Sequence, residues 1–182
     1  MNCITQECPW QSNMVTLGNR DLLVTYKTAF FCSRRCPAQV VLKSYDWAIE
    51  KRKAKTCVLS GNHSQIEKDV VHYLLKGNQP IILALARGIK KRLEPEFTEA
   101  LERNRLLIIT PFESSVTRVI QETANKRNDL MAELADEIFV AYARPGGNVE
   151  QLVMKWLKKG KRVSTFDVVE NRHLLEAEVV EV

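Results

Sequence analysis

The sequence has no long hydrophobic run and no leader-like start. None of its apolar stretches approaches the about 20 residues that a membrane-spanning helix needs. Its first ten residues, MNCITQECPW, lack the basic-then-apolar pattern of a signal peptide. We therefore expect a cytoplasmic protein that does not associate with membranes. Internal repeats, linkers and low-complexity stretches are also missing, so 182 residues with 45% hydrophobic and 27% charged side chains predict one globular domain.

Several signatures of cofactor-dependent and hydrolytic enzymes are missing as well. The chain has neither a GxGxxG fingerprint nor a GxxxxGK[ST] loop, which disfavours a nicotinamide dehydrogenase or a P-loop NTPase. It has no HExxH motif, no GxSxG elbow and no cysteine–histidine pattern of nucleophilic catalysis. We therefore expect no cofactor. The histidines show no metal-binding spacing; they are His63, His72 and His173.

The cysteines are few and odd in number. Two loose pairs, Cys3/Cys8 and Cys32/Cys36, could together supply four zinc ligands, while Cys57 lies in an apolar stretch typical of a buried strand. Both spacings are wider than the usual two-residue knuckle, and a cytosolic chain keeps its thiols reduced. The favoured prediction is reduced cysteines with no metal, and structural zinc remains the alternative.

Apolar strand-like stretches alternate with amphipathic helical ones along the chain. This alternation predicts an α/β protein, a single Rossmann-like three-layer domain with a mainly parallel sheet. We expect the domain over residues 21–168, an irregular extension over 1–20, and a tail over 169–182, of which residues 174–182 are an edge strand or disordered. Strands are expected within residues 22–31, 56–59, 80–86, 106–110, 137–142 and 162–166, and helices within 38–53, 65–76, 97–103, 116–135 and 149–159.

Hydroxyls, glycines and basic side chains recur in the loops that follow the expected strands. In a parallel sheet these loops meet at the carboxyl ends of the strands, where anionic ligands bind. Arginines and backbone amides reachable at glycine suit phosphate, and the net charge of +5 fits a polyanionic partner. The expected phosphate-binding residues are Ser33, Arg34, Gly61, Asn62, His63, Ser64, Arg87, Lys90, Lys91, Gly146 and Gly147.

Each of these residues also has a plainer explanation. Gly61 and Gly147 could serve only as turns, and His63 could simply cap its helix. The basic run over residues 87–92 could be a solvated loop. Arg127 lies within an expected helix, where periodicity alone gives it no special role.

Three stretches resemble the DNA-processing protein A (DprA/Smf) family. They are FCSR at residues 31–34, SGNHSQIE at 60–67, and KRN followed by AELAD at 126–136. The resemblance covers most of residues 22–168 and implies a Rossmann-like core that binds single-stranded DNA through a basic pocket. It also adds Arg127 and Asn128 to the expected site and makes a homodimer the expected state.

The same block resembles the related LOG family of nucleoside-monophosphate phosphoribohydrolases. Arg127 falls on the functional arginine of that family, and residues 145–147 fall on the start of its glycine loop. Val153, however, stands where that family has its catalytic glutamate, which leaves Glu67 and Glu150 as weak catalytic candidates. The leading prediction is therefore binding of single-stranded DNA without catalysis. The alternatives are a nucleotide sensor, a LOG-like hydrolase, or an assembly module with a vestigial pocket.

Overall fold

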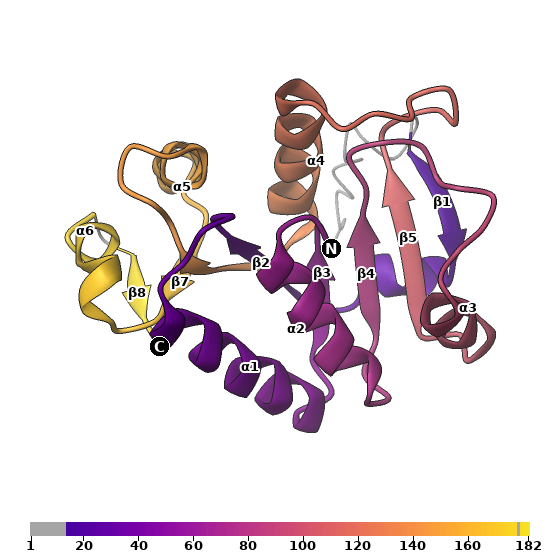
Figure 1. Ribbon diagram of the computed structural model, residues 1–182, viewed down its shortest axis with the longest axis horizontal. Helices are drawn as coiled ribbons and strands as arrows, with labels where there is room; N and C mark the ends of the chain where they lie inside the picture. The colour runs from indigo at the N-terminus through magenta and orange to yellow at the C-terminus, as the bar shows by residue number, and fades with distance from the viewer. Residues whose placement is uncertain (1–13, 178) are drawn as a thin grey trace, which may run out of the picture.

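One mainly parallel sheet forms the centre of the molecule (Figure 1). The computed structural model describes residues 14–177 and 179–182. Within them, eight strands follow the order β1-β5-β4-β3-β2-β6-β7-β8, and every neighbouring pair is parallel except β1 with β5. The strands are β1 (Val15–Gly18), β2 (Lys27–Cys32), β3 (Cys57–Ser60), β4 (Ile81–Ala84), β5 (Leu106–Thr110), β6 (Glu137–Tyr142), β7 (Val163–Thr165) and β8 (Val180–Glu181).

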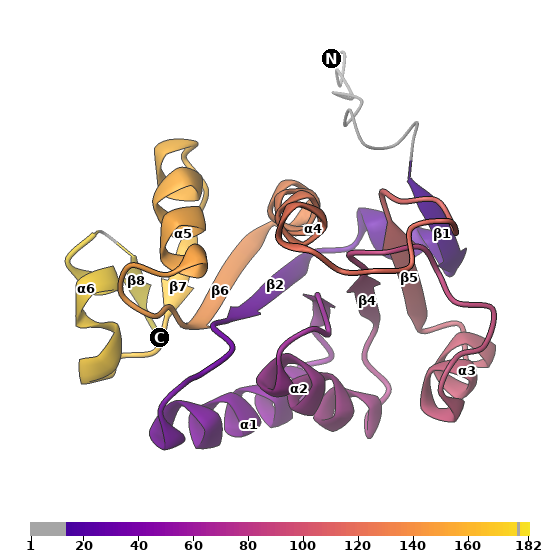
Figure 2. The same cartoon turned by 45° about the horizontal axis from the view of Figure 1, so that its top comes forward.

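Helices cover both faces of this sheet (Figure 2). The first face carries α1 (Ala38–Lys53), α2 (Gln65–Leu75) and α3 (Pro95–Glu102), and the second carries α4 (Gln121–Leu134) and α5 (Asn148–Lys158). The short α6 (Arg172–Leu175) lies beside β8, at one end of the sheet. The predicted Rossmann-like three-layer fold is confirmed. No helix within the described residues is both long and apolar enough to cross a membrane.

The central strand β2 holds the three layers together. All six of its residues are buried, and successive side chains point to opposite faces. Phe30 packs against Trp47 of α1, with ring centroids 5.0 Å apart, and Phe31 packs against Trp156 of α5 at 4.6 Å. Because both faces are apolar, the strand reads in the sequence as a continuous hydrophobic run rather than an alternating one.

The order in which successive strands are added to the sheet reverses at β2. The chain runs outward through β3, β4 and β5, then returns to place β6 on the other side of β2. In parallel α/β sheets, the carboxyl ends of the two strands at such a reversal open into a crevice. The loops after β2 and β6 therefore border the position where a ligand is expected.

Two expectations for the first half of the chain are wrong. The expected strand over residues 22–31 begins only at Lys27, because Arg20–Val24 forms a 3-10 turn whose start is capped by the Asn19 side chain. The extension over residues 1–20 is not irregular throughout, since Val15–Gly18 pairs with the edge strand β5. Residues 1–13 lie outside the described part of the chain.

Two expectations for the second half are also resolved. The helix expected from Val116 begins at Gln121, because the Ile120 amide donates to Thr123 Oγ1 at 3.0 Å. Residues 111–120 form a loop instead, and the Val116 carbonyl accepts from the Gly88 amide at 2.8 Å. For the tail, the edge-strand alternative holds for Val180–Glu181, which pair parallel with β7, whereas Arg172–Leu175 form the short helix α6.

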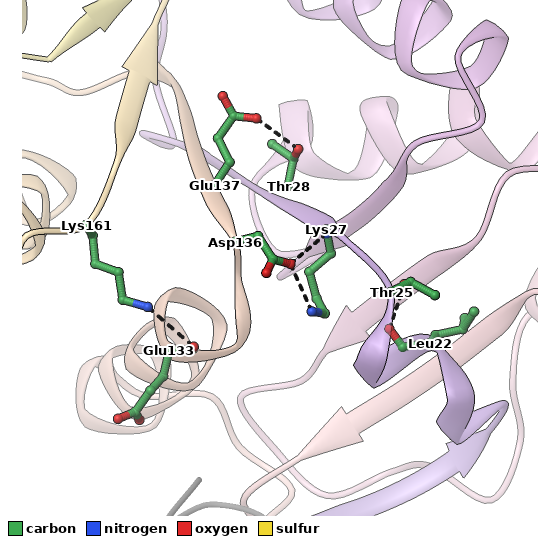
Figure 3. Close-up of polar contacts among 8 residues, drawn as sticks. All are labelled: Leu22, Thr25, Lys27, Thr28, Glu133, Asp136, Glu137 and Lys161. Carbon is green, nitrogen blue, oxygen red and sulfur yellow. Dashed lines mark hydrogen bonds and ion pairs between the residues drawn. The ribbon is translucent and has the colours of Figure 1, made fainter. Parts of the chain in front are cut away.

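An ion pair between buried Lys27 and exposed Asp136 joins the start of β2 to the start of β6 (Figure 3). One carboxylate oxygen of Asp136 accepts from the Lys27 amide at 2.9 Å and from its ammonium group at 3.1 Å. The Lys27 side chain is only 5% exposed and the Asp136 side chain 42%, so the carboxylate is the partner that compensates a buried ammonium group. The final aspartate of the AELAD stretch thus fixes how α4 passes into β6.

Replacing Asp136 should therefore destabilise the fold. We expect Asp136→Ala to lower the free energy of unfolding by about 2 to 3 kcal/mol, because it leaves a buried ammonium group without its carboxylate. Asp129→Ala is the matched control: it removes a partner of Lys155 in an exposed pair and should cost less than about 1 kcal/mol. Urea unfolding monitored by circular dichroism measures both, and equal costs would contradict a structural role for the Lys27–Asp136 pair.

Candidate anion-binding site

Two adjoining cavities open at the carboxyl ends of the strands. The larger, of 350 Å³, lies among the loops that follow β2, β3 and β6 and the first turns of α4. The smaller, of 210 Å³, lies between α2, the loop after β4 and residue Val119. His63 and Arg127 line both cavities, so these two side chains form the wall between them.

The Arg127 guanidinium is buried between α4 and the sheet. The residue is 3% exposed, and its Nη1 donates to the carbonyl oxygens of Gly61 at 2.8 Å and Ala84 at 3.4 Å. Its Nε donates to the side-chain oxygen of Asn128 at 2.8 Å. Burial lowers the pKa of Arg127, and the nearby Glu67 opposes that shift. A guanidinium nevertheless stays charged in proteins, so a full positive charge lies in the wall between the cavities.

Gly61 is a glycine because Arg127 needs its space. Its φ is not in the left-handed region, so conformational freedom is not the reason. A Cβ at this position would clash with Nη1 and Cζ of Arg127. The SGN stretch and the KRN stretch, far apart in sequence, are therefore one structural unit.

The His63 ring is neutral, and its Nε2 faces the Arg34 guanidinium. Arg34 Nη2 lies 3.3 Å from its Nε2, and because arginine only donates, Nε2 must be the acceptor and Nδ1 must carry the proton. Burial lowers the pKa of His63, and the charges of Arg127 and Arg34 lower it further. Bound phosphate would offset these positive charges and so favour the protonated ring.

Two glutamates already occupy backbone amides that could otherwise bind phosphate. One oxygen of Glu67 accepts from the amides of His63 at 2.9 Å and Ser64 at 2.7 Å, which caps α2. One oxygen of Glu150 accepts from the Gly146 amide at 2.7 Å. Glu67 therefore caps α2, and Glu150 binds an amide of the loop before α5. The start of α2 is consequently closed to an anion.

The start of α5 has no such cap. Its N-cap residue is Gly147, and no side chain of the described residues caps the helix. Asn148 and Val149, the first two residues of α5, line the larger cavity. First-turn amides and the helix dipole both favour negative charge at this position.

Ser33 links the two loops that border the larger cavity. Its amide donates to the Tyr142 carbonyl at 2.9 Å, and its hydroxyl accepts from the Arg144 amide at 3.0 Å. The loops after β2 and β6 are thus joined at the point where the sheet order reverses. Three exposed arginines from these loops complete the lining: Arg34, Arg35 and Arg144.

Most of the predicted phosphate-binding residues meet at these cavities. The larger cavity has Ser33, Arg34, His63, Ser64, Arg127, Asn128 and Gly147, and the smaller has Gly61, Asn62, His63, Arg87, Lys90 and Arg127. Lys91 is exposed and lines neither, and Gly146 is exposed with its amide bound to Glu150. Sequence reasoning missed Gln121 because it placed the helix start at Val116; Asn148, which directly follows Gly147, also lines the larger cavity.

Metal binding finds no support in the described part of the chain. Residues 14–177 and 179–182 contain no cluster of three or more histidine, cysteine, aspartate or glutamate side chains that could hold a metal ion. Cys32, Cys36 and Cys57 are free thiols. Cys3 and Cys8 lie outside the described residues, so the four-cysteine zinc alternative stays a hypothesis.

The fold and the site together define a Rossmann-like α/β domain with a cationic crevice at its switch point. Its fold is that of DNA processing protein A. The Streptococcus pneumoniae structure superposes with a TM-score of 0.76 at 20% identity, over 93% of this chain and 62% of that one. This chain thus spans less than two thirds of the pneumococcal structure.

Other solved structures share the fold. DNA processing protein A from Helicobacter pylori, a protein with a single-stranded DNA binding mode, matches with a TM-score of 0.72 at 18% identity, over 92% of this chain and 80% of that one. The molybdenum cofactor carrier protein of Chlamydomonas reinhardtii matches at 0.58 and 12% identity, over 87% and 89%. No family model and no curated protein matches the sequence significantly. The resemblance stated from the sequence is confirmed at the level of fold.

The pairing of Gly61 with Arg127 can be tested by a double-mutant cycle. Gly61→Ala should cost about 2 to 3 kcal/mol of unfolding free energy, because the new methyl group displaces the buried guanidinium. In an Arg127→Ala background the same substitution should cost at least about 1 kcal/mol less, since the clash is gone.

Gly160→Ala is the matched control for this cycle. Gly160 has a φ of 71° and open space around it, so its substitution is strained but touches nothing. It should cost about 1 kcal/mol in either background. Strictly additive costs for Gly61→Ala and Arg127→Ala would contradict the proposed contact.

Proposed function

We propose that this protein binds single-stranded nucleic acid through its phosphates, with one phosphate in the larger cavity. The observation that carries the proposal is the buried charge of Arg127. Within the described residues, no carboxylate lies within ion-pair distance of it. A buried cation held only by carbonyl and amide oxygens is costly, and an anionic ligand would offset that cost.

The rest of the larger cavity has the chemistry that a phosphate needs. Arg34, Arg35 and Arg144 add planar donors at its rim, and the uncapped start of α5 adds amides. Contacts of this kind bind the backbone of a nucleic acid whatever its sequence. They support binding that is insensitive to sequence and sensitive to salt.

The smaller cavity supports a ligand longer than one phosphate. Leu83, Phe97 and Ile108 give it an apolar side, while Arg87 and Lys90 supply positive charge at its edge. A flat, partly apolar base with a charged backbone matches this mixed lining. Because the two cavities meet at His63 and Arg127, a single strand could place neighbouring nucleotides in both. The shared fold of the Helicobacter pylori protein supports this assignment.

Nucleotide hydrolysis is disfavoured by the positions of the acidic side chains. Val153 occupies the position where the LOG family has its catalytic glutamate. It is fully buried in the core between α5 and the sheet, so it faces away from the solvent. Glu67 and Glu150 accept hydrogen bonds from loop amides, and neither has the role of a free general acid. Binding without cleavage is therefore the function that we propose, in a homodimer as both family resemblances imply.

The rim arginines provide the first test. We expect the double variant Arg34→Ala/Arg144→Ala to bind a labelled thymidine 20-mer about tenfold to a hundredfold more weakly, since two charge-assisted contacts are lost. The slope of the logarithm of the binding constant against the logarithm of salt concentration should also become shallower by about 1.4, since each of the two lost phosphate contacts contributes ~0.7 in a single strand. Fluorescence anisotropy at several salt concentrations measures both quantities.

The control for this test is Arg172→Ala, an exposed arginine of α6 that lines neither cavity. Its affinity should stay within about twofold of the unmodified protein, as for a change outside the binding surface. If the rim variant and this control bind equally well, the larger cavity is not the DNA site.

Ligand length separates a nucleic-acid site from a small-nucleotide site. A strand that uses both cavities should bind at least about a hundredfold more tightly than thymidine monophosphate, because the second cavity adds further contacts. Calorimetry compares the two ligands, and chromatography of incubated nucleoside monophosphates should detect no released base. Equal affinities would indicate a nucleotide sensor, and base release would indicate a hydrolase.

A further inference from the structure

A pair of thiols brackets the loop that carries the rim arginines. Cys32 is the last residue of β2, is 5% exposed, and lines the larger cavity. Cys36 is half-buried and packs against the core cluster that contains Cys32. Only Ser33, Arg34 and Arg35 separate the two, and all three line the larger cavity. A covalent link between the thiols would therefore act directly on the cavity wall.

The two thiols belong to one packed cluster and differ in reactivity. The interaction between the two thiols raises the pKa of Cys32, which burial raises further, and lowers the pKa of Cys36. Cys36 also directly precedes Pro37, the N-cap of the 16-residue helix α1, where the helix dipole favours a thiolate. A partly exposed low-pKa thiol beside a second thiol is the arrangement of redox-sensing cysteines.

Cys57 offers the contrast within the same sheet. It is 3% exposed in β3, and burial raises its pKa. It lies opposite Lys27, at the far end of β2 from Cys32. Among the described thiols, Cys32 and Cys36 are therefore the only two that lie near each other and that an oxidant can reach.

We propose that Cys32 and Cys36 form a disulfide when a peroxide oxidises the protein, and that this disulfide weakens ligand binding in the larger cavity. The Cys36 thiolate attacks one peroxide oxygen; the O–O bond breaks, an S–O bond forms, and the other oxygen leaves as hydroxide, which takes the proton that Cys36 lost on ionisation and becomes water. The Cys32 sulfur then attacks the Cys36 sulfenic acid, so that an S–S bond forms while hydroxide leaves and takes the Cys32 proton. Two thiols and one hydrogen peroxide thus yield one disulfide and two waters.

The link to binding follows from the geometry of the bracketed loop. A disulfide holds its Cβ atoms about 3.8 Å apart with a fixed torsion, which tightens the segment between the two cysteines. That segment supplies the Ser33 hydroxyl that accepts from Arg144 and the Arg34 guanidinium that contacts His63. Moving it disturbs the cationic rim. The effect on affinity rests on the proposed function, whereas disulfide formation itself does not.

Peptide mapping tests the disulfide without any ligand. Full-length protein with Cys3→Ser and Cys8→Ser, so that only the described thiols react, is treated with hydrogen peroxide and digested with trypsin under non-reducing conditions. Trypsin cleaves after Arg34 and Arg35, inside the loop, so residues 28–34 and 36–43 should appear as one linked species that dithiothreitol separates. The linked species should persist in a Cys57→Ser control and be absent from Cys36→Ser.

DNA binding by the same samples tests the consequence. We expect oxidation to weaken binding of the thymidine 20-mer about tenfold, the loss of roughly one charge-assisted contact, with recovery in dithiothreitol. Oxidised Cys36→Ser should bind like reduced protein. A linked species that forms without any change in affinity, or no linked species at all, would overturn the proposal. If even the reduced protein fails to bind DNA, the proposed function fails, while the linked peptides still decide whether the disulfide forms.

Discussion

The hydrogen bond from Arg127 to the Gly61 carbonyl is the contact on which the site depends. It ties α4 to the carboxyl end of β3, and the weaker bond to Ala84 extends the tie to β4. The contact requires a residue without a side chain at position 61. It also places a permanent charge where two cavities meet, and that charge helps to keep His63 neutral. One interaction thus sets the packing, the electrostatics and the shape of the site together.

The chain's own carboxylates decide where an anion can bind. Glu67 closes the start of α2 and Glu150 occupies the amide of Gly146, so two positions that look suited to phosphate are already satisfied. The start of α5 is left uncapped, and the rim arginines surround it. A glycine-rich loop is therefore only potentially a phosphate loop, because a nearby acidic side chain can bind the same amides.

Much of the fold could be predicted because its signals are local. The strands are buried on both faces and appear as continuous apolar runs, so β5 and β6 lie where the sequence places them, as does helix α1. The segment before α4 could not be predicted in this way. Two serines before Val116 could cap a helix that starts there, yet the Val116 carbonyl accepts a hydrogen bond from the Gly88 amide of another loop. That hydrogen bond depends on tertiary contacts, which periodicity does not report.

The sequence by itself determined the α/β class, the parallel sheet and the gathering of basic loops at one edge, since hydrophobic pattern and strand direction dictate these features. Motif resemblance pointed to Arg127 but could not say what it does. Only the tertiary structure decided that Gly61 leaves room for this guanidinium, that Glu67 and Glu150 bind loop amides, and that Val153 faces the core. The physical reason is the same in each case: a side chain's role depends on which partner satisfies it, and those partners come from distant parts of the chain.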